Sequence, residues 1–196
     1  FIHKLITMNK KTEFEMTDLL WSNSILIENP EITHIWNFRK RVLSYLNSTF
    51  SNEKFDHLCE QELELISQCI NHDSKAYCVW NHRIYVFNIK PTRNFEIEHE
   101  HICRILMKEP RNFHCWNYLR HFLHIFPNKW DKELIFTKKM IDIDFSNFSA
   151  WHHRTIVISK SFSQLLDDEI FIDKELKMLH NAVYTDPWDQ SPWIYY

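Results

Sequence analysis

The sequence contains no glycine among its 196 residues. The phosphate-binding loops of dinucleotide-binding and P-loop folds need glycine where the backbone approaches the ligand, so both classes are excluded. Tight two-residue hairpins also favour glycine, which argues against an all-β fold. Long apolar runs are absent too. No stretch approaches the roughly 18 residues of a membrane-spanning helix, and we expect no membrane span.

A strong charge of either sign is also lacking. The chain carries 23 Lys and Arg against 26 Asp and Glu, which leaves a net charge of −3. A duplex-binding protein needs a basic surface, so we expect no nucleic-acid partner.

Disulfide and metal-binding patterns are missing as well. The five cysteines are Cys59, Cys69, Cys78, Cys103 and Cys115. Their number is odd, no two form a Cys-x-x-Cys pair, and no signal-peptide pattern precedes them. This favours buried thiols in a reducing, cytoplasmic setting. Thirteen histidines are present, but none has a Cys or a carboxylate at zinc-site spacing, so we expect no metal site in this chain.

What the sequence does contain is a repeat marked by tryptophan. The repeat positions are Trp36, Trp80, Trp116, Trp151 and Trp193, separated by 44, 36, 35 and 42 residues. Three kinds of residue recur around them. They are a proline six places before (Pro30, Pro110, Pro187), an aromatic residue three places before (Tyr77, Phe113, Phe148) and an arginine three places after (Arg39, Arg83, Arg154). In the third repeat Leu119 replaces the arginine.

The sequence of each repeat predicts two helices. In the second repeat, apolar residues from Phe55 to Ile70 follow helical spacing. Asn71–Ser74 then interrupts this pattern with residues that favour a turn. A second apolar face then begins at Tyr77 and is limited by Pro91. The same pattern predicts helices over 97–107 and 113–122 in the third repeat, and over 134–143 and 148–158 in the fourth. The longest connections are expected near 47–53, 89–94 and 159–168.

A helix pair this short cannot bury its own apolar face, and stacked pairs share one core. We therefore expect a single repeat domain over residues 1–196. The chain begins at Phe1 rather than Met and stops within the fifth repeat, which indicates a fragment. All five repeat tryptophans should be buried on second helices, and the arginines should hydrogen-bond neighbouring units. Trp21, Trp130 and Trp188 lie outside the motif and should be more exposed.

The Trp-Asn/His-x-Arg core after an Asn-Pro or Asp-Pro turn resembles the α-subunit repeat of the protein prenyltransferases, over about residues 15–196. A tetratricopeptide array, with its constant period and required Gly, does not fit. The resemblance implies an all-α fold, a right-handed crescent or solenoid of antiparallel helical hairpins. In that family the crescent wraps a separate β subunit, which holds the catalytic zinc and the isoprenoid pocket. We therefore expect no cofactor in this chain and no activity from it alone.

Two enzyme classes share this architecture, and the resemblance is to the type II class, Rab geranylgeranyltransferase. Residues 111–116, 145–154 and 185–193 are similar to its third, fourth and fifth repeats. CaaX enzymes have a Gln that binds the substrate's terminal carboxylate where Cys78 stands, and a Tyr where Thr33 stands. The implied partners are a β subunit, a Rab GTPase presented by an escort protein, and geranylgeranyl diphosphate. Two alternatives stay open, the α subunit of a CaaX enzyme and a non-catalytic helical scaffold.

The resemblance also implies site residues. Lys75, five places before Trp80, corresponds to the one lysine that the family's α subunit lends to the diphosphate leaving group. Tyr77, Asn112, Phe113 and His114 correspond to residues that line the substrate cavity. An ordinary solvated lysine at position 75, and a capping or packing role for His114, remain the alternatives.

Overall fold

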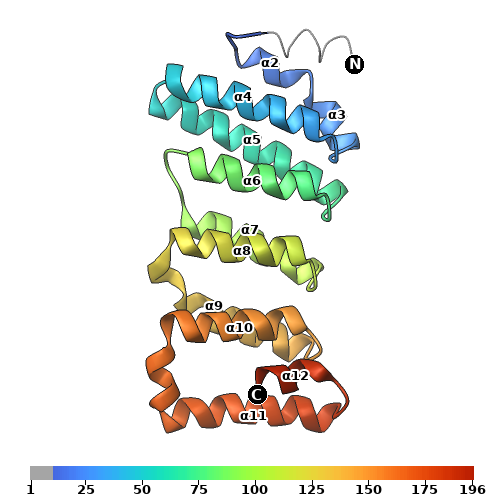
Figure 1. Cartoon of the computed structure of the whole chain (residues 1–196), viewed down its shortest axis with the longest axis vertical. Coiled ribbons are helices and arrows are strands. Elements are labelled where there is room, and N and C mark those ends of the chain that lie inside the picture. Colours follow the sequence, from blue (N-terminus) through green and yellow to red (C-terminus); the bar gives the residue numbers. More distant parts are fainter. Residues whose placement is uncertain (1–10) are drawn as a thin grey trace. The chain divides into compact units, whose positions relative to one another are not determined.

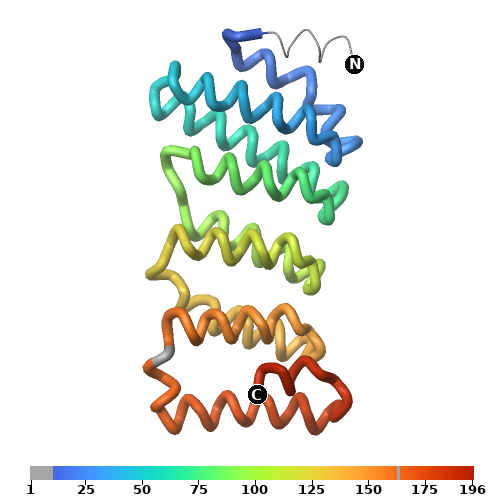
Figure 2. The backbone as a smooth tube through the Cα atoms, in the orientation of Figure 1, coloured from blue at the N-terminus to red at the C-terminus, as the bar shows by residue number. Residues whose placement is uncertain are grey.

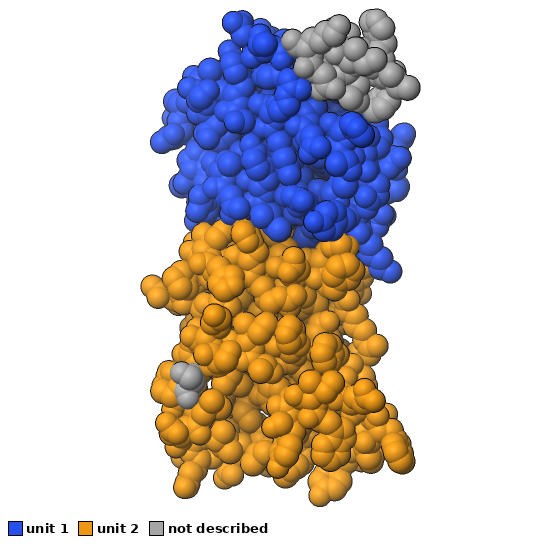
Figure 3. Space-filling model, in the orientation of Figure 1, with its two compact units in different colours: residues 1–94 blue, residues 95–196 orange. Residues whose placement is uncertain are grey.

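The computed structural model describes residues 11–196, without the side chain of Ser163, and within that range it contains helices and no strand (Figure 1). The path of the backbone runs from hairpin to hairpin (Figure 2). The chain divides into two compact units, residues 1–94 and 95–196 (Figure 3). The all-helical architecture expected from the sequence is confirmed, whereas the single domain over residues 1–196 stays a prediction.

The first unit contains two repeats. Its helices are α2 (Thr17–Leu20), α3 (Asn23–Glu28), α4 (Thr33–Thr49), α5 (Asn52–His72) and α6 (Tyr77–Ile89). The outer helix α5 packs against α3 and α6, and the two inner helices α4 and α6 also pack together. The connection expected over 47–53 is only Phe50 and Ser51, because α4 continues to Thr49 and the Ser51 hydroxyl caps α5 by accepting from Lys54 N.

The second unit contains three repeats. Its helices are α7 (Phe95–Lys108), α8 (Phe113–Ile125), α9 (Asp131–Ile143), α10 (Phe148–Ser161), α11 (Glu169–Thr185) and α12 (Gln190–Tyr195), with short 3₁₀ turns η1 (Pro127–Lys129) and η2 (Ser163–Asp167). The inner helices α8, α10 and α12 pack side by side. The hairpins expected for the third and fourth repeats are confirmed within a few residues at each end.

One hydrogen bond recurs in every repeat. Each motif indole N–H donates to the backbone carbonyl six residues earlier. The five pairs are Trp36 to Pro30 (2.7 Å), Trp80 to Ser74 (2.8 Å), Trp116 to Pro110 (2.8 Å), Trp151 to Phe145 (2.7 Å) and Trp193 to Pro187 (3.0 Å). The bond closes the turn before the inner helix onto the face of that helix. It satisfies a carbonyl that the helix itself cannot reach.

Four of the five motif tryptophans are buried as expected, but Trp193 is 52% exposed, so that expectation is wrong for the fifth repeat. Trp193 lies on α12, which has only six residues, and no described residue covers its outer side. Of the tryptophans outside the motif, Trp188 is 92% exposed and Trp21 half-buried, but Trp130 is buried. Trp130 stacks near the rings of His124 and His153, which a sequence pattern cannot reveal.

A carboxylate stands eighteen residues before each motif tryptophan from the second repeat onward, buried in the second to fourth repeats and half-buried in the fifth. It accepts a hydrogen bond from the residue two places after that tryptophan. The four pairs are Glu62 with His82 (2.7 Å), Glu98 with Tyr118 (2.7 Å), Glu133 with His153 (3.0 Å) and Glu175 with Tyr195 (2.5 Å). Each bond joins the outer helix of a hairpin to its inner helix.

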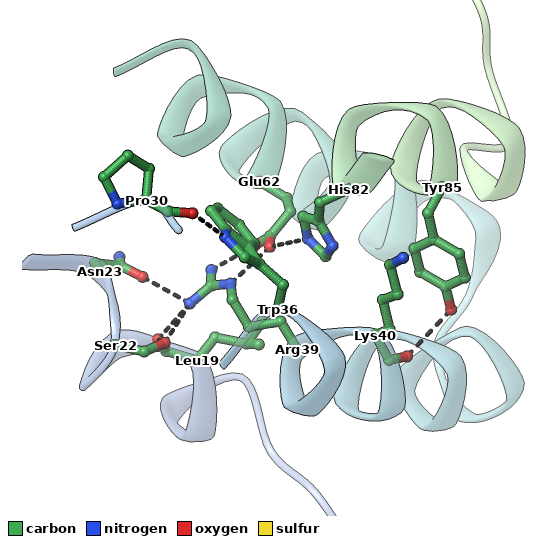
Figure 4. Close-up of polar contacts among 10 residues, drawn as sticks. All are labelled: Leu19, Ser22, Asn23, Pro30, Trp36, Arg39, Lys40, Glu62, His82 and Tyr85. Atoms are coloured by element: carbon green, nitrogen blue, oxygen red, sulfur yellow. Dashed lines mark hydrogen bonds and ion pairs between the residues drawn. The ribbon is translucent and has the colours of Figure 1, made fainter. Parts of the chain in front are cut away.

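Two of the three motif arginines join one hairpin to the next through the same carboxylates, whereas the third, Arg83, bonds the Ser67 hydroxyl on the outer helix of its own hairpin. Arg39 donates to both oxygens of Glu62 at 2.7 and 2.5 Å, and its third nitrogen bonds the Ser22 hydroxyl (Figure 4). Arg154 forms the same paired bond with Glu175, at 2.7 and 2.5 Å. The expectation that the arginines tie neighbouring repeats is confirmed at these two positions.

The third repeat, which has Leu119 instead of arginine, uses a different donor. His99 on α7 donates to Glu133 at 2.6 Å, while His153 occupies the other oxygen of that carboxylate. The carboxylate thus remains satisfied on both sides. Histidines that looked like loose metal ligands in the sequence therefore serve as structural donors.

The cysteines are free thiols in the described structure. Cys59, Cys69 and Cys115 are buried, as expected, whereas Cys78 and Cys103 are half-buried. Burial raises the pKa of Cys59 and Cys69 to about 12, which keeps both in the thiol form.

The Glu62 cluster carries a definite protonation pattern. Burial alone would raise the pKa of Glu62, but Arg39 and His82 outweigh it and hold that pKa at about 2. Burial lowers the pKa of His82 below its usual 6.5. His82 Nδ1 has no partner in the described residues, so protonating it would bury an N–H without an acceptor.

The pH dependence of stability follows from these directions. Because both folded pKa values lie below the unfolded ones, each group contributes stability that is present above its unfolded pKa. The contribution of His82 declines as the pH falls below 6.5, and that of Glu62 declines between 4.5 and about 2. Glu62→Gln should lower the free energy of unfolding by about 3–5 kcal/mol at pH 7. It should also flatten the acid limb of the stability curve.

Urea unfolding, followed by far-UV circular dichroism at several pH values, measures both effects. Glu64→Gln is the matched control, because Glu64 lies exposed on the same helix. An unchanged acid limb in Glu62→Gln would show that the cluster does not set the pH dependence.

The indole bond can be tested with an internal control. Trp151→Phe keeps the aromatic packing but removes the donor to Phe145, which leaves a partly buried carbonyl unpaired. It should cost about 1–3 kcal/mol. Trp193→Phe removes the same bond at an exposed site and should cost about 0.5 kcal/mol or less. Equal losses in the two variants would contradict the role assigned to burial.

Candidate functional site

The turns that precede the inner helices lie next to each other within each unit. In the first unit, the Glu31 carboxylate accepts from Tyr77 N at 3.0 Å, and the Thr33 hydroxyl lies 3.1 Å from Cys78 Sγ. Residues 31–33 before and at the start of α4 therefore meet residues 77–78 at the start of α6. The turn before α6 is itself fixed, because Asp73 accepts from Lys75 N at 2.9 Å.

Lys75 projects from this turn into solvent. It is exposed, and its ammonium makes no hydrogen bond or ion pair with any residue that the structure describes. This is unlike Lys90 in the same unit, which is buried and bonds Asp56 at 2.6 Å. Lys75 is thus held by its backbone while its side chain is free to meet an external anion.

Tyr77 lies beside Lys75 at the first position of α6 and is 62% exposed. Cys78 is half-buried against Thr33, as described above. The two positions at which this chain departs from the CaaX pattern therefore contact each other. A thiol is only a weak donor to a carboxylate.

A polar stripe between α4 and α6 was not anticipated from the sequence. Lys40 on α4 bonds Asn81 on α6 at 3.1 Å and lies 5.3 Å from the centre of the Tyr85 ring. Partial burial lowers the pKa of Lys40, and the nearby Cys78 opposes that shift. A lone lysine within an amphipathic helix carries no signal, so the sequence alone could not single it out.

The second unit has the same row of turns. Asn147 Nδ2 donates to the Pro110 carbonyl at 3.0 Å, and Arg111 reaches Asp144 at 3.2 Å. Ser191 Oγ donates to the Ser146 carbonyl at 3.4 Å. The turns before α8, α10 and α12 are therefore linked in order.

The three candidates of the third repeat take different roles. Asn112 is buried and caps α8, because its side-chain Oδ1 accepts a hydrogen bond from Cys115 N at 3.0 Å. Its amide is thus directed into its own turn. Phe113 is 65% exposed and half-buried His114 lies against it, with ring centres 3.8 Å apart. The substrate-lining role of these residues stays a prediction.

Several basic side chains lie on the neighbouring faces of α8 and α10. Arg120 is half-buried and makes no hydrogen bond or ion pair within the described residues, and burial lowers its pKa. Burial and Arg120 together lower the pKa of His152. Burial and His124 do the same for His121. These groups are close enough to disfavour each other's charged forms.

Lys75 and Asn112 belong to different units. Whether both residues line one site therefore stays a prediction. In the described part of the chain no three His, Cys, Asp or Glu side chains are grouped as metal ligands. No helix there is both long and apolar enough to cross a membrane.

Comparison with known proteins agrees with this architecture. The protein prenyltransferase alpha subunit repeat matches residues 59–89, 95–126 and 130–161. These three segments each contain one outer and one inner helix, and they include Trp80, Trp116 and Trp151.

Similar proteins come from distant eukaryotes. The chain is 34% identical to the geranylgeranyl transferase type-2 subunit alpha of Rattus norvegicus over 94% of its own length and 34% of the rat protein. It is 29% identical to the protein of the same name from Saccharomyces cerevisiae, over 97% of this chain and 60% of that one. The chain thus spans between about a third and three fifths of these relatives.

A solved structure is also similar. A chain of the Candida albicans protein geranylgeranyltransferase-I complexed with GGPP superposes with a TM-score of 0.75 and 26% identity. The match covers 97% of this chain and 62% of that chain. The repeats, the relatives and this structure together show that the chain belongs to the protein prenyltransferase α-subunit family.

Proposed function

We propose that the chain is part of the α subunit of a Rab geranylgeranyltransferase. Such an enzyme joins geranylgeranyl from its diphosphate to C-terminal cysteines of Rab GTPases that an escort protein presents. The observation that carries the proposal is the free ammonium of Lys75, held on a fixed turn at the family's diphosphate position. The relatives named type-2 subunit alpha, from mammals to yeast, support the type II class.

The partner that completes the site is a β subunit. It would hold the zinc, which keeps the acceptor cysteine in its thiolate form, and it would enclose the isoprenoid. This chain would contribute the row of turns, with Lys75 and Tyr77 exposed upon it. Alone it would be inactive, because it supplies neither the thiolate nor the apolar pocket. The reaction would take place in the cytoplasm.

Lys75 would act on the leaving group. Negative charge accumulates on the diphosphate as the bond to C1 of the isoprenoid breaks, so a nearby cation stabilises the transition state more than the ground state. The ammonium has no partner to give up among the residues that the structure describes. The backbone bond from Lys75 N to Asp73 limits the motion of its Cα.

The Cys78–Thr33 contact bears on the substrate class. A CaaX enzyme reads the substrate's terminal carboxylate with a Gln at position 78, and here that position is a thiol already paired with Thr33. This favours a substrate whose C-terminus this chain does not read. The likeness to a type I structure supports the alternative, a CaaX α subunit. Transfer to a Rab–escort complex rather than to a CaaX peptide distinguishes the two, and a helical scaffold without enzymatic function would support neither.

Substitution of Lys75 tests the proposal. In the assembled heterodimer, Lys75→Ala should slow single-turnover transfer by about 10²-fold, because one electrostatic partner of the leaving group is lost. Lys75→Arg should recover part of the rate, because the charge remains while its geometry changes. Rapid quenching with radiolabelled geranylgeranyl diphosphate and a Rab–escort complex measures the step.

The control for this experiment is Lys54→Ala. Lys54 is an exposed lysine on the outer helix α5 of the same unit, and its substitution should leave the rate unchanged. Heterodimer assembly should be equal in all variants. A Lys75→Ala rate within twofold of the parent would assign Lys75 to the solvated surface.

Lys75→Ala should also be nearly neutral for stability. The change should be within about 0.5 kcal/mol, because the side chain has no partner in the described part of the chain. Lys90→Ala, which leaves the Asp56 carboxylate without its ammonium, should cost about 1–3 kcal/mol. Chemical denaturation of the two variants measures the difference, and an equal loss would give Lys75 a structural role instead.

A further inference from the structure

Glu133 on α9 differs from the carboxylate of the next hairpin in the charge of its partners. Glu175 receives a paired bond from Arg154, whose guanidinium stays protonated at every pH at which proteins fold. Within the described residues, the side-chain partners of Glu133 are two imidazoles, His99 at 2.6 Å and His153 at 3.0 Å. The contact between the third and fourth hairpins therefore depends on groups that gain or lose a proton near neutral pH.

This cluster of Glu133, His99 and His153 lies in the interior. The side chains of Glu133 and His153 are fully buried, and that of His99 is 13% exposed. Burial alone would raise the pKa of Glu133, but the hydrogen bonds and charges of His153 and His99 outweigh burial and lower that pKa. Glu133 is therefore ionised at neutral pH. Because the attraction between two charges is reciprocal, a buried carboxylate without a permanent cation favours uptake of a proton by its partners.

The two sides of the carboxylate offer different places for that proton. His153 Nδ1 has no hydrogen-bond partner in the described residues, and the ring lies near two indole rings. A proton there would bury an N–H without an acceptor. On the other side, Cys103 Sγ lies 3.8 Å from His99 Nδ1 and can accept a weak hydrogen bond from it. The proton therefore belongs on the His99 side of the cluster.

Basic groups around His153 reinforce this asymmetry. Burial lowers the pKa of His152, and the charges of Arg120 and His153 add to that effect. Because repulsion is mutual, His152 also disfavours an imidazolium at His153. Two further titratable groups on this side are Arg154, which is paired with Glu175, and His124, beyond the ring of Trp130.

On the His99 side, by contrast, carboxylates offset the positive charges. Burial raises the pKa of Cys103 to about 12, so this residue stays a neutral thiol. The Phe95 ring stacks on His99, with ring centres 5.0 Å apart. The other charged groups near this side are Glu100 and Lys139 beside the thiol, and Lys129 and Lys132, which are paired with Glu96 near the Phe95 ring.

We propose that Glu133, His99 and His153 form a proton-sensitive junction between the third and fourth hairpins. The three groups titrate as one coupled unit, which takes up a single proton near neutral pH. With that proton, the bond from His99 to Glu133 is an ion pair, and without it a neutral imidazole faces a buried carboxylate. Charge-assisted hydrogen bonds are roughly twice as strong as neutral ones. The inference does not involve Lys75, and it is independent of the function proposed above.

Proton linkage gives the sign of the effect. The folded cluster binds the proton more tightly than the separate groups of the unfolded chain do. It therefore contributes stability below the unfolded histidine value of about 6.5, and this contribution declines as the pH rises. The contribution of His82 has the opposite sign, because it declines as the pH falls. Variants of His99 are needed to separate the two.

His99→Gln tests the proposal, because a glutamine amide can still donate to Glu133 but cannot take up a proton. The full-length parent and variant are unfolded with urea at about pH 8 and about pH 6, followed by far-UV circular dichroism. Between these pH values, the unfolding equilibrium of the parent should shift toward the folded state by about tenfold relative to that of the variant. The matched control is His180→Gln, at an exposed histidine of the same unit, which should follow the parent.

Hydrogen exchange locates the effect in the chain. Protection factors are corrected for the intrinsic exchange rate at each pH. For residues 95–108 and 131–143, the parent should gain about tenfold more protection on acidification than His99→Gln does. Residues 52–72 in the first unit should behave alike in both proteins.

Exchange of the donor is a second test that does not depend on the folding of His99→Gln. Leu119 stands where three other repeats have arginine, and its side chain is fully buried on α8. Leu119→Arg/His99→Ala supplies a permanent cation and vacates the space of the imidazole for it. This double variant should show the same weakened pH dependence as His99→Gln, because its guanidinium does not titrate.

Four results would each overturn the proposal. The first is an equal pH dependence of stability in the parent and His99→Gln. The second is a His180→Gln effect as large as that of His99→Gln. The third is a difference in exchange confined to residues 52–72. The fourth is the parent's full pH dependence in Leu119→Arg/His99→Ala.

Discussion

The bond from each motif indole to the carbonyl six residues earlier is the constraint on which the other contacts depend. It closes the turn before the inner helix, so the first residue of that helix and its cap have fixed places. Once the turn is fixed, the side chain two places after the tryptophan reaches the carboxylate of its own outer helix. The side chain three places after it reaches the next hairpin. One tryptophan thereby sets the geometry of contacts in two repeats.

The carboxylates convert isolated hairpins into a stack. A buried carboxylate with one donor missing costs several kcal/mol, whereas a fully bonded one can be neutral or stabilising. Glu62 and Glu175 each receive donors from two successive hairpins. Where Leu119 removes the arginine, His99 supplies the second donor to Glu133. The chain has therefore kept the satisfied carboxylate while changing the residue that satisfies it.

The sequence predicted what depends on side-chain type and spacing, and missed what depends on three-dimensional partners. The hairpins, the buried tryptophans and the tying role of Arg39 and Arg154 follow from periodicity. The four glutamates stand at a constant distance before their tryptophans, yet acids on an outer helix normally face solvent, so this spacing alone does not indicate that they accept internal hydrogen bonds. The exposure of Trp193 depends on how closely neighbouring helices pack, which local sequence does not encode.

The position five places before each tryptophan illustrates how a repeat can carry function without losing its fold. It holds Glu31, Lys75, Arg111, Ser146 and Trp188 in the five repeats. The indole bond does not use the side chain at this position, which is therefore free to differ: Glu31 and Arg111 link neighbouring turns, whereas Lys75 extends into solvent. Charge, polarity and size can then vary there at small cost in stability. The fold therefore tolerates a lysine at one such position and a 92% exposed tryptophan at another. Contacts with partner molecules can then differ from repeat to repeat along one scaffold.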